Sequence, residues 1–398
     1  MRGIWRKLRL GPLLCVMCLT GHAQSESGMW DWTPLPSVGG VADTAYRKGV
    51  SAVYAGRLGE RLVVAGGCNF PGVPAAEGGK KTYYNDVYAL RLDAPDRGWE
   101  RVGRLPEAAA YGVALPTDSG VAFIGGTTSH GPLAAVWELR GSEKDGEVTC
   151  DGLPPLPMAV DNMAGVRLGR RLYVVGGNVS GAPSNRMFSL SLDSLTAEWR
   201  EEPPFPGEPR TQPVAVALRR GGESCLFLFG GFAGASASCP ASVSLTAWCY
   251  VPSARRWEPV AAPTDGRGES LALGGGAGYA LDDTTALCLG GVNKDVFLAA
   301  LQREQRLAEA RASGNGSLVR ALQSAGHDYM TRPPAWYRFN RCVLRYTSTA
   351  DRWDVVAEAD QAARAGAALV GRGPTFYYFG GELKPGVRTP ALWQGRLR

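Results

Sequence analysis

The sequence predicts an all-β fold of six repeated four-stranded units, closed into a ring by an N-terminal strand and carrying a helical insertion in the fifth unit. Three observations predict it. A run of β-forming residues that ends in Gly-Gly recurs six times, and a tryptophan usually follows late in each unit. The chain of 398 residues has 53 glycines and 27 prolines but few long helical patterns. All-β folds often use such a length for one closed domain.

The N-terminal segment 1–23 is expected to be a cleaved signal peptide. A short apolar stretch at 12–20 precedes Gly-His-Ala, and a basic start comes before it at Arg2, Arg6, Lys7 and Arg9. This is the layout of a secretory signal, with an apolar run too short to span a membrane. We expect cleavage after Ala23, a propeller domain over 24–398, and a periplasmic or secreted protein.

A lipoprotein is the rival interpretation of this segment, through Cys15 or Cys18, but Leu14 and Met17 are poor small-residue neighbours for a modified cysteine. Removing the signal takes away four positive and no negative charges, so the formal net charge falls from +6 to about +2. The basic pI therefore indicates little about partners.

The Gly-Gly runs define the repeat. They read RLVVAGG, GVAFIGG, RLYVVGG, CLFLFGG, TALCLGG and TFYYFGG, with first glycines at Gly66, Gly125, Gly176, Gly230, Gly290 and Gly380. The offsets between them are 59, 51, 54, 60 and 90 residues. Such periodic self-similarity is the signature of a repeat architecture.

Each doublet has similar surroundings. An apolar strand precedes the doublet strand, another strand follows, and a segment that opens on tryptophan usually ends the unit, at Trp99, Trp199, Trp257 and Trp353. The unit beginning near Tyr111 has VTCDGLPPLP in that place instead. Four short strands a unit predict the blades of a β-propeller, and the doublet with a late Trp resembles the kelch repeat. Glycine would allow positive φ near the axis, and Trp would fill the wedge between blades.

The sixth unit is incomplete at the C-terminus, because only ALWQGRLR follows TFYYFGG. The segment WDWTPLP at 30–36 has the Trp and proline pattern of an outer strand. We therefore expect this N-terminal strand to complete the sixth blade and to close the ring, which removes exposed sheet edges.

The 90-residue offset contains an insertion at about 294–330. Phe297, Leu298, Leu301 and Ala308 have helical spacing, and Ser-Gly-Asn-Gly separates them from a second apolar stretch. We expect a helical hairpin on the fifth blade. It could serve as a cap or an oligomer contact, or it could pack as a charged helix on the flank of the propeller.

Several classes of function lack a signal. After the signal segment only His130 and His327 remain, far apart, which disfavours metal sites and Ser-His-Asp triads. No phosphate-binding glycine loop and no basic block interleaved with aromatics occurs, so neither a nucleotide cofactor nor nucleic acid is expected. Seven cysteines remain, and their odd number and wide spacing do not form a disulfide framework.

Residues just after the doublets are the candidates for a site, because they are expected at the mouth of the central channel. They are Asn69, Thr127, Asn178, Phe232, Asn293 and Glu382. Propellers often bind ligands on this axis. Taken singly, each Asn also fits a turn residue that bonds local backbone.

The segment GELKPGVRT concentrates charge. Pro385-Gly386 predicts a tight turn that folds Glu382 and Arg388 toward each other. A nearby arginine lowers the pKa of a carboxylate by roughly 1 to 3 and keeps it ionised as a base. The guanidinium could instead hold an anionic substrate. From the spacing alone, a simple loop salt bridge is the better interpretation.

Several motifs resemble the N-acetylneuraminate epimerase family, in its cyclically permuted mutarotase branch: NFPG…GGKK…NDVY, PGEPRTQPVAVAL, LGGGAGYAL, LGGVNKDVFLAAL and GGELKPGVRT. The resemblance covers the chain from about Trp30 to its end. It implies a six-bladed kelch propeller, without a cofactor, that interconverts the α and β anomers of N-acetylneuraminic acid, with Glu382 as the acid/base and Arg388 as its partner. In the unpermuted branch the Glu…Arg motif lies mid-chain.

On this basis Glu382 is expected to take the anomeric proton, while Arg388 pairs with the sugar carboxylate and orients Glu382. Arg210, Lys294, Asn293, Asn178 and Asn69 are further candidates for substrate contacts, and loop roles remain open for them. A sialidase is an alternative, but its Ser-x-Asp-x-Gly-x-Thr-Trp boxes are absent. A non-enzymatic kelch scaffold that binds glycan or protein, or a mutarotase for another sugar, is also compatible, as is a homodimer.

Overall fold

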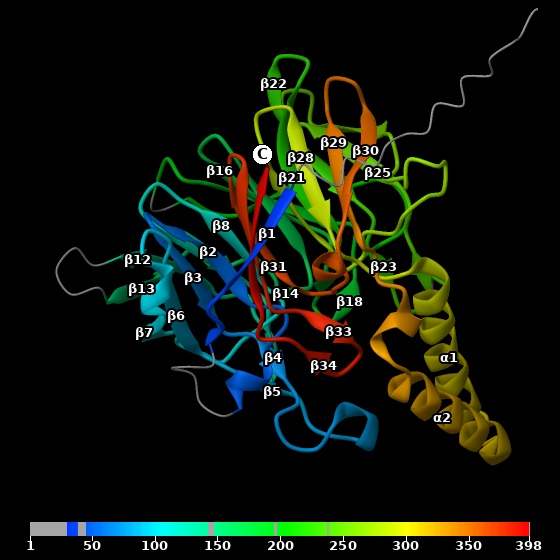
Figure 1. Cartoon of the computed structure of the whole chain (residues 1–398). Coiled ribbons are helices and arrows are strands. Elements are labelled where there is room, and N and C mark those ends of the chain that lie inside the picture. The colour runs from blue at the N-terminus through cyan, green and yellow to red at the C-terminus, as the bar shows by residue number, and fades with distance from the viewer. Residues whose placement is uncertain (1–29, 39–44, 142–146, 195–196, 237–238, 398) are drawn as a thin grey trace, which may run out of the picture.

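The computed structural model describes residues 30–38, 45–141, 147–194, 197–236 and 239–397. Over these ranges the chain forms six four-stranded antiparallel sheets and a pair of helices, in a propeller-like arrangement (Figure 1). The predicted signal segment lies outside the described residues. Neither described helix is long and apolar enough to cross a membrane.

The first three sheets follow one another along the chain. Sheet 1 contains β2 (Tyr54–Leu58), β3 (Arg61–Ala65), β6 (Asp86–Arg91) and β7 (Trp99–Arg104). Sheet 2 contains β8 (Val113–Pro116), β9 (Val121–Ile124), β12 (Val136–Gly141) and β13 (Val148–Leu153). Sheet 3 contains β15 (Ala164–Leu168), β16 (Arg171–Val175), β19 (Met187–Ser191) and β20 (Arg200–Glu202).

The last three sheets continue the pattern. Sheet 4 contains β21 (Val214–Arg220), β22 (Glu223–Phe229), β25 (Ala247–Val251) and β26 (Arg256–Val260). Sheet 5 contains β27 (Ala277–Ala280), β28 (Thr285–Leu289), β29 (Cys342–Thr347) and β30 (Arg352–Glu358). Sheet 6 contains β31 (Ala368–Arg372), β32 (Thr375–Phe379), β35 (Leu392–Leu397) and, at its edge, β1 (Trp30–Leu35).

The N-terminal strand completes sheet 6, as the sequence predicts. β1 pairs antiparallel with β35 from Trp30 opposite Leu397 to Leu35 opposite Leu392. The rings of Trp30 and Trp32 lie 5.5 and 5.2 Å from the ring of Phe376 on β32. The two ends of the described chain therefore share one sheet, which Figure 1 shows as blue β1 beside the red C-terminal strands.

The hydrophobic core is divided among the interfaces between successive sheets. One cluster of buried residues lies between each consecutive pair, including sheets 6 and 1, where Phe379 and Leu392 pack with Leu62, Val64 and Trp99. The late tryptophans cross these interfaces. The indole N–H groups of Trp99, Trp199, Trp257 and Trp353 donate to backbone carbonyls of the preceding sheet's final loop at 2.7 to 2.9 Å, on Pro36, Pro154, Pro203 and Ala261. The wedge role predicted for Trp is confirmed.

The Gly-Gly doublets follow the second strand of every sheet and have positive φ at both residues, 56° to 71° at the first and 82° to 104° at the second. A side chain at the first glycine would collide with the backbone of the next sheet. A Cβ built on Gly125, for example, lies 2.4 Å from the carbonyl oxygen of Val160. The doublet therefore marks both a left-handed turn and a close approach between sheets.

A short hairpin follows five of the six doublets in the described chain. Its strands are β4 (Cys68–Asn69) with β5 (Thr82–Tyr83), β10 (Thr127–Thr128) with β11 (Gly131–Pro132), β17 (Asn178–Val179) with β14 (Val160–Asp161) and β18 (Ala182–Pro183), β23 (Phe232–Ala233) with β24 (Ser242–Val243), and β33 (Glu382–Lys384) with β34 (Val387–Arg388). In sheet 5 the helices α1 (Lys294–Ala312) and α2 (Gly316–Thr331) take this place.

The helical pair occupies the stretch predicted for an insertion, and its position corrects the flank interpretation. The ammonium of Lys384, on β33, donates to the carbonyls of Met330 and Arg332 at the end of α2, at 3.2 and 2.8 Å. A ring nitrogen of His327 lies 3.3 Å from the carbonyl of Ala76 in the 3-10 turn Ala75–Glu77. The helices thus contact the hairpins of sheets 6 and 1 at the end where the doublets lie (Figure 1).

A ring of six hydrogen bonds joins the sheets around their common centre. In each sheet, the residue two positions before the first strand donates its backbone N–H to the carbonyl of the equivalent residue in the preceding sheet, at 2.7 to 3.0 Å. The six residues are Ala52, Tyr111, Asn162, Gln212, Gly275 and Gly366. The N–H of Ala52 donates to the carbonyl of Gly366, which closes the cycle. All six have φ between 46° and 74°. This ring forms the floor of the axial opening.

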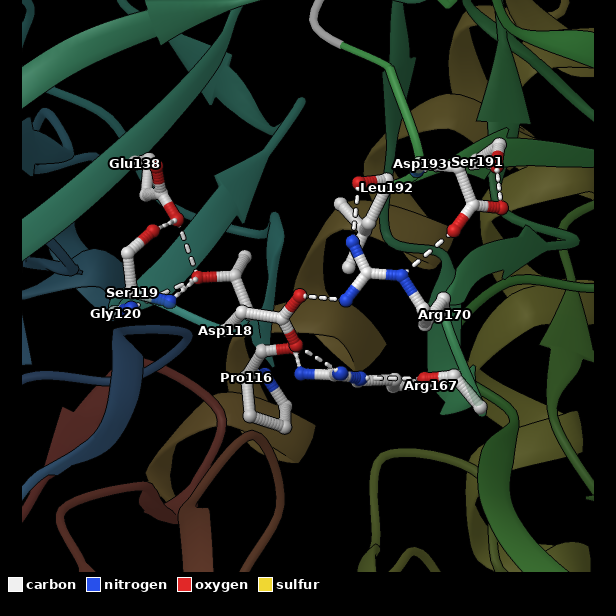
Figure 2. Close-up of polar contacts among 12 residues, drawn as sticks. Pro116, Asp118, Ser119, Gly120, Glu138, Arg167, Arg170, Ser191, Leu192 and Asp193 are labelled. Carbon is white, nitrogen blue, oxygen red and sulfur yellow. Dashed lines mark hydrogen bonds and ion pairs between the residues drawn. The ribbon is translucent and has the colours of Figure 1, made fainter.

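The opposite end of the sheets carries paired surface charge. Figure 2 shows Asp118, in the turn after β8, accepting hydrogen bonds from Arg167 and Arg170 of the β15–β16 hairpin. Arg170 also bonds Asp193 through Nε at 2.6 Å. These contacts join sheets 2 and 3, and each of the four charged side chains has an oppositely charged partner.

Candidate functional site

The residue after each doublet lies beside the axial ring. These positions are Cys68, Thr127, Asn178, Phe232, Val292 and Glu382. Each pairs through its backbone with the residue that precedes the ring position of its own sheet, as Glu382 does with Ala365 at 2.7 and 3.1 Å. Asn178, Thr127, Phe232 and Glu382 are therefore equivalent, as predicted. Asn69 and Asn293 are one residue further along, which is a correction.

The axial end is divided into an apolar and a polar half. The Phe232 ring packs on Phe297 of α1 with centroids 4.7 Å apart, and Val292 is buried in the same cluster with Tyr329 and Ala300. The helices thus cover the side formed by sheets 4 and 5. The side formed by sheets 6, 1, 2 and 3 keeps polar groups, so it is the part of the axis that suits a polar ligand.

Glu382 and Arg388 form an ion pair at this polar side. They lie directly opposite each other on β33 and β34, and Pro385 and Gly386 form the turn between the strands. Arg388 Nη2 contacts Glu382 Oε1. The Glu382 side chain is 24% exposed and that of Arg388 only 2%, so the carboxylate faces outward and the guanidinium lies beneath it.

The guanidinium is held by further contacts. Arg388 Nε donates to the hydroxyl of Ser51 at 3.1 Å, and the guanidinium carbon lies 4.9 Å from the centre of the Phe70 ring. Nη1 is buried and has no hydrogen-bond partner among the described protein atoms. Because a planar guanidinium offers five donors in a rigid fork, these contacts fix the direction from which Glu382 is bound.

Burial raises the pKa of Glu382 above its usual 4.5, while the charges of Arg388 and Lys81 act in the opposite direction. A carboxyl group that leaves water loses hydration of its charged form, and the two cations recover only part of that loss. The result is a carboxylate that is more basic than an exposed glutamate. Such a shift is typical of groups that transfer protons near neutral pH.

Lys81 and Tyr111 complete the surroundings of this pair. Lys81 Nζ donates to the Tyr111 hydroxyl at 3.0 Å and lies 4.8 Å from the centre of its ring. Burial raises the pKa of the Tyr111 phenol well above 10, and the nearby carboxyl of Glu382 adds to this effect. The sequence analysis did not select either residue. The GGKK stretch was a motif of the family resemblance, but a tyrosine in a turn carries no signal of its own.

Asn178 belongs to a polar network on the same side. Its amide donates to Asp161 at 2.7 Å, and the Asn162 amide donates to the same oxygen at 2.6 Å. Gln212 in turn donates to Asn162 at 2.7 Å. Tyr111, Asn162 and Gln212 also line an axial cavity of about 140 Å³, whose lining includes none of Asn178, Lys81, Glu382 and Arg388. Asn178 thus lies where the prediction placed it, and Asp161 is a buried carboxylate that the sequence analysis missed.

Asn69 has a structural environment. Its amide donates to the carbonyls of Ala45 and Gly49 at 2.8 and 2.9 Å, and its oxygen accepts from the Tyr84 hydroxyl at 2.8 Å. The side chain is turned into the protein and 2% of the residue is exposed. All its hydrogen-bonding atoms are used, which leaves none for a substrate.

Asn293 and Lys294 belong to the start of α1. Asn293 is the N-cap and accepts from the backbone of Val296 at 3.1 Å. Lys294 is the first helical residue and is exposed. Both line a cavity with Glu269, Arg338 and Asn340 whose lining does not include Glu382 or Arg388. The structure does not bring them together with the ion pair.

Arg210 is a buried link between sheets. Nη1 donates to the carbonyls of Gly230 and Thr246 at 3.0 and 3.4 Å, and Nη2 to the Thr246 hydroxyl at 2.9 Å. Arg364 makes the same pair of bonds with Gly380 and Ala391 in sheet 6. Desolvation lowers the pKa of Arg210 to about 10. Its contacts are those of a repeated structural arginine.

The described residues contain no group of three or more His, Cys, Asp and Glu placed to hold a metal ion. The charged and polar groups described around Glu382 are the Arg388 guanidinium, the Lys81 ammonium and the Tyr111 phenol.

A family model described as N-acetylneuraminate epimerase matches residues 19–148 and 153–398. Curated proteins of that name are similar to the chain: one from Yersinia enterocolitica is 33% identical over 246 residues, which is 62% of this chain and 57% of the relative, and one from Vibrio vulnificus is 28% identical over 59% and 57%. The chain thus spans little more than half the length of these relatives. A solved structure, "Structure of YjhT", is similar with a TM-score of 0.50 and 23% identity over 61% of this chain and 64% of that one.

Proposed function

Because this chain belongs to the N-acetylneuraminate epimerase family, we propose that it interconverts the α and β anomers of N-acetylneuraminic acid. The observation that carries the proposal is the Glu382–Arg388 ion pair on the hairpin of sheet 6, beside the axial ring. No other doublet in the described chain is followed by such a pair. A loop salt bridge explains the contact but not its place on the axis or the raised pKa of Glu382.

In this mechanism Glu382 is the base. Mutarotation of a cyclic ketose removes a proton from the anomeric hydroxyl and delivers one to the ring oxygen, which opens the ring; the reverse steps close it on the other face. Glu382 is partly exposed, and in its ionised form it can accept the anomeric proton and return it.

Arg388 orients Glu382. The burial of its side chain favours this role over direct contact with the sugar carboxylate. Of the further candidates for substrate contacts, Asn178 lies in the open polar sector and is retained. Asn69, Asn293, Lys294 and Arg210 are omitted, because their contacts or positions serve the fold.

The same proposal includes a closed six-bladed kelch-type propeller whose chain is permuted relative to other family members. The six sheet interfaces, the axial ring of hydrogen bonds and the pairing of β1 with β35 support it. A permuted chain also explains partial coverage of the relatives, since a collinear alignment follows only one of two exchanged segments.

We also propose export, with cleavage after Ala23, on the basic and apolar pattern of the N-terminal segment. Mass spectrometry of the protein purified from its natural host tests this. A mature chain that begins at Gln24 supports export, and a chain that retains Arg2 and its neighbours argues against it.

The test of the activity is proton NMR of anomer exchange. α-N-Acetylneuraminic acid, freshly released from a sialoside, is mixed with the protein, and the approach to the α/β equilibrium is followed. We expect acceleration by the wild-type protein and a rate about 10² to 10⁴ lower for Glu382→Gln. Glu60→Gln, which alters an exposed ion-paired glutamate far from the axis, is the matched control.

Two other outcomes would replace the proposal. Cleavage of an intact sialoside would indicate a sialidase. Binding of glycan or protein without either reaction would indicate a kelch scaffold. If Glu382→Gln equilibrates the anomers as fast as the wild-type protein, Glu382 is not the base.

A further inference from the structure

Tyr111 is the one aromatic residue among the six residues of the axial ring. Its φ of 63° does not set it apart, because Ala52, Asn162 and Gln212 also have positive φ. The equivalent positions hold alanine, asparagine, glutamine and two glycines, so the fold has no need of a bulky aromatic there. The phenol is therefore a candidate for a role in the site rather than in the fold.

The backbone of Tyr111 is fixed on both sides. Its N–H donates to the Ala52 carbonyl at 2.9 Å, and its own carbonyl accepts from Asn162 at 2.7 Å. The ring of hydrogen bonds therefore fixes the position of the Tyr111 backbone. Lys81 fixes the position of the hydroxyl, because Lys81 Nζ donates to it at 3.0 Å.

The phenol lies within the electrostatic range of the Glu382–Arg388 pair. The charge of Glu382 raises the pKa of the Tyr111 phenol, and the charge of Arg388 lowers it. The charge of Lys81 in turn lowers the pKa of Glu382. Burial keeps the phenol protonated at neutral pH. The site thus holds a carboxylate that accepts a proton and a phenol that carries one.

We propose that Tyr111 is the second catalytic residue and donates a proton to the ring oxygen of the sugar, with Lys81 as its positioning residue. This inference rests on the proposed anomer exchange. One carboxylate alone would need a water molecule to complete the reaction, whereas the Glu382 and Tyr111 side chains supply both proton transfers.

The steps balance without any other reactant. Glu382 takes the proton of the anomeric hydroxyl, the electrons of that O–H bond form the C=O bond, and the bond from the anomeric carbon to the ring oxygen breaks. The ring oxygen keeps that electron pair and takes the proton of Tyr111, which becomes a phenolate beside the Lys81 ammonium. After rotation of the open ketone, the phenolate removes the hydroxyl proton, the oxygen attacks the other face, and Glu382 returns its proton to the carbonyl oxygen.

The test compares Tyr111→Phe with wild type in the NMR exchange assay. The variant keeps the ring and loses the hydroxyl, and we expect kcat to fall about 10² to 10⁴ with KM roughly unchanged. Lys81→Met should lower kcat by about 10 to 100, the worth of one hydrogen bond to a charged group. Tyr279→Phe is the matched control, since that hydroxyl donates only to the Gly373 carbonyl at 3.1 Å between sheets 5 and 6. Thermal unfolding of each variant checks that the fold is kept.

The outcomes separate this inference from the function on which it rests. If wild type accelerates exchange, Glu382→Gln abolishes it and Tyr111→Phe behaves as Tyr279→Phe does, the Tyr111 assignment is overturned and the anomer exchange stands. A raised KM with unchanged kcat in Tyr111→Phe would also overturn it, because it would show substrate binding alone. If wild type gives no acceleration, both proposals fail.

Discussion

At the scale of single residues, the site depends on a carboxylate that is partly withdrawn from water. Glu382 lies on the outward side of a buried guanidinium, and its pKa is raised by burial and held down by two cations. Arg388 is therefore more than an ion-pair partner. It orients Glu382 and lowers the pKa of that carboxyl against the larger effect of burial. The Ser51 hydroxyl and the Phe70 ring hold the guanidinium in place.

This arrangement predicts the pH dependence of anomer exchange. The base must be ionised, so the rate rises as pH increases through the pKa of Glu382, and the midpoint should lie above 4.5. Arg388→Met removes the larger of the two lowering influences, so the midpoint should move to higher pH. A pH–rate profile of both proteins measures this. Arg372→Met, which removes an exposed partner of Glu60, should leave the midpoint unchanged, and a shift to lower pH in Arg388→Met would contradict the argument.

At the scale of elements, the doublets determine how closely the sheets approach. The two glycines turn the chain with positive φ and also pass against the backbone of the next sheet. These two demands can be separated experimentally, because other glycines share the conformation without the contact.

Gly125→Ala and Gly169→Ala form a matched pair for this purpose. Both glycines have φ of 56°, but a Cβ on Gly125 lies 2.4 Å from the Val160 oxygen and one on Gly169 meets nothing within 4 Å. Gly169→Ala should cost about 1 to 2 kcal/mol of unfolding free energy, and Gly125→Ala a further 1 to 3 kcal/mol. Urea unfolding measures both. Equal losses would mean that conformation alone explains the doublet.

The helical pair is a second element whose position matters for the site. Lys384 lies on the strand that carries Glu382 and bonds two carbonyls at the end of α2, where a cation is also favoured by the helix dipole. The helices therefore help to hold the hairpin that carries Glu382 and Arg388.

Lys384→Met should loosen this contact. We expect faster hydrogen exchange in the last turn of α2 and in the β33–β34 hairpin, together with a loss of activity of a few-fold. The midpoint of thermal unfolding should change little, because one hydrogen-bonded contact is worth only about 1 to 3 kcal/mol. Lys294→Met, at the exposed start of α1, is the control. Unchanged exchange in both segments would show that the helices do not support the hairpin.

At the scale of the whole molecule, stability depends on the contact between the first and last described strands. β1 covers the outer edge of β35, and its tryptophans pack on Phe376. The interface between sheets 6 and 1 then joins the end of the series to its beginning.

A chain that begins at Pro36 should therefore be much less stable. It loses two large aromatic contacts and exposes a sheet edge, and we expect a fall of at least about 10 °C in the unfolding temperature, with aggregation. A permuted chain is the control: Leu397 is joined to Trp30 by a short turn, and the new termini are placed between 38 and 45. Trp30 and Leu397 are already paired across β1 and β35, so the permuted chain should keep the stability of the original. Equal stability of the truncated chain would show that β1 is dispensable.

Much of this architecture could be predicted from the sequence, because repetition reveals it. The doublets, the late tryptophans and the Ser-Gly-Asn-Gly break each mark a local demand of the backbone or of an interface, and the structure places them where those demands occur. The roles of Glu382 and Arg388 come from the family resemblance of GGELKPGVRT, because their spacing alone favours a loop salt bridge.

The remaining members of the site depend on the tertiary structure. Asn69 and Asn293 lie one residue further from their doublets than Asn178 does. On β4 this shift turns the Asn69 side chain to the other face of the strand, and Asn293 caps α1 instead. Arg210 has the charge of a substrate contact but is used between sheets.

The sequence by itself determined the repeated unit, the insertion and the charged hairpin, because each follows from short-range backbone chemistry. Only the tertiary structure decided which side chains surround Glu382. Lys81, Tyr111 and Arg388 come from three segments separated by up to about 300 residues, and their proximity results from the curvature of six packed sheets around one axis, which no local pattern encodes.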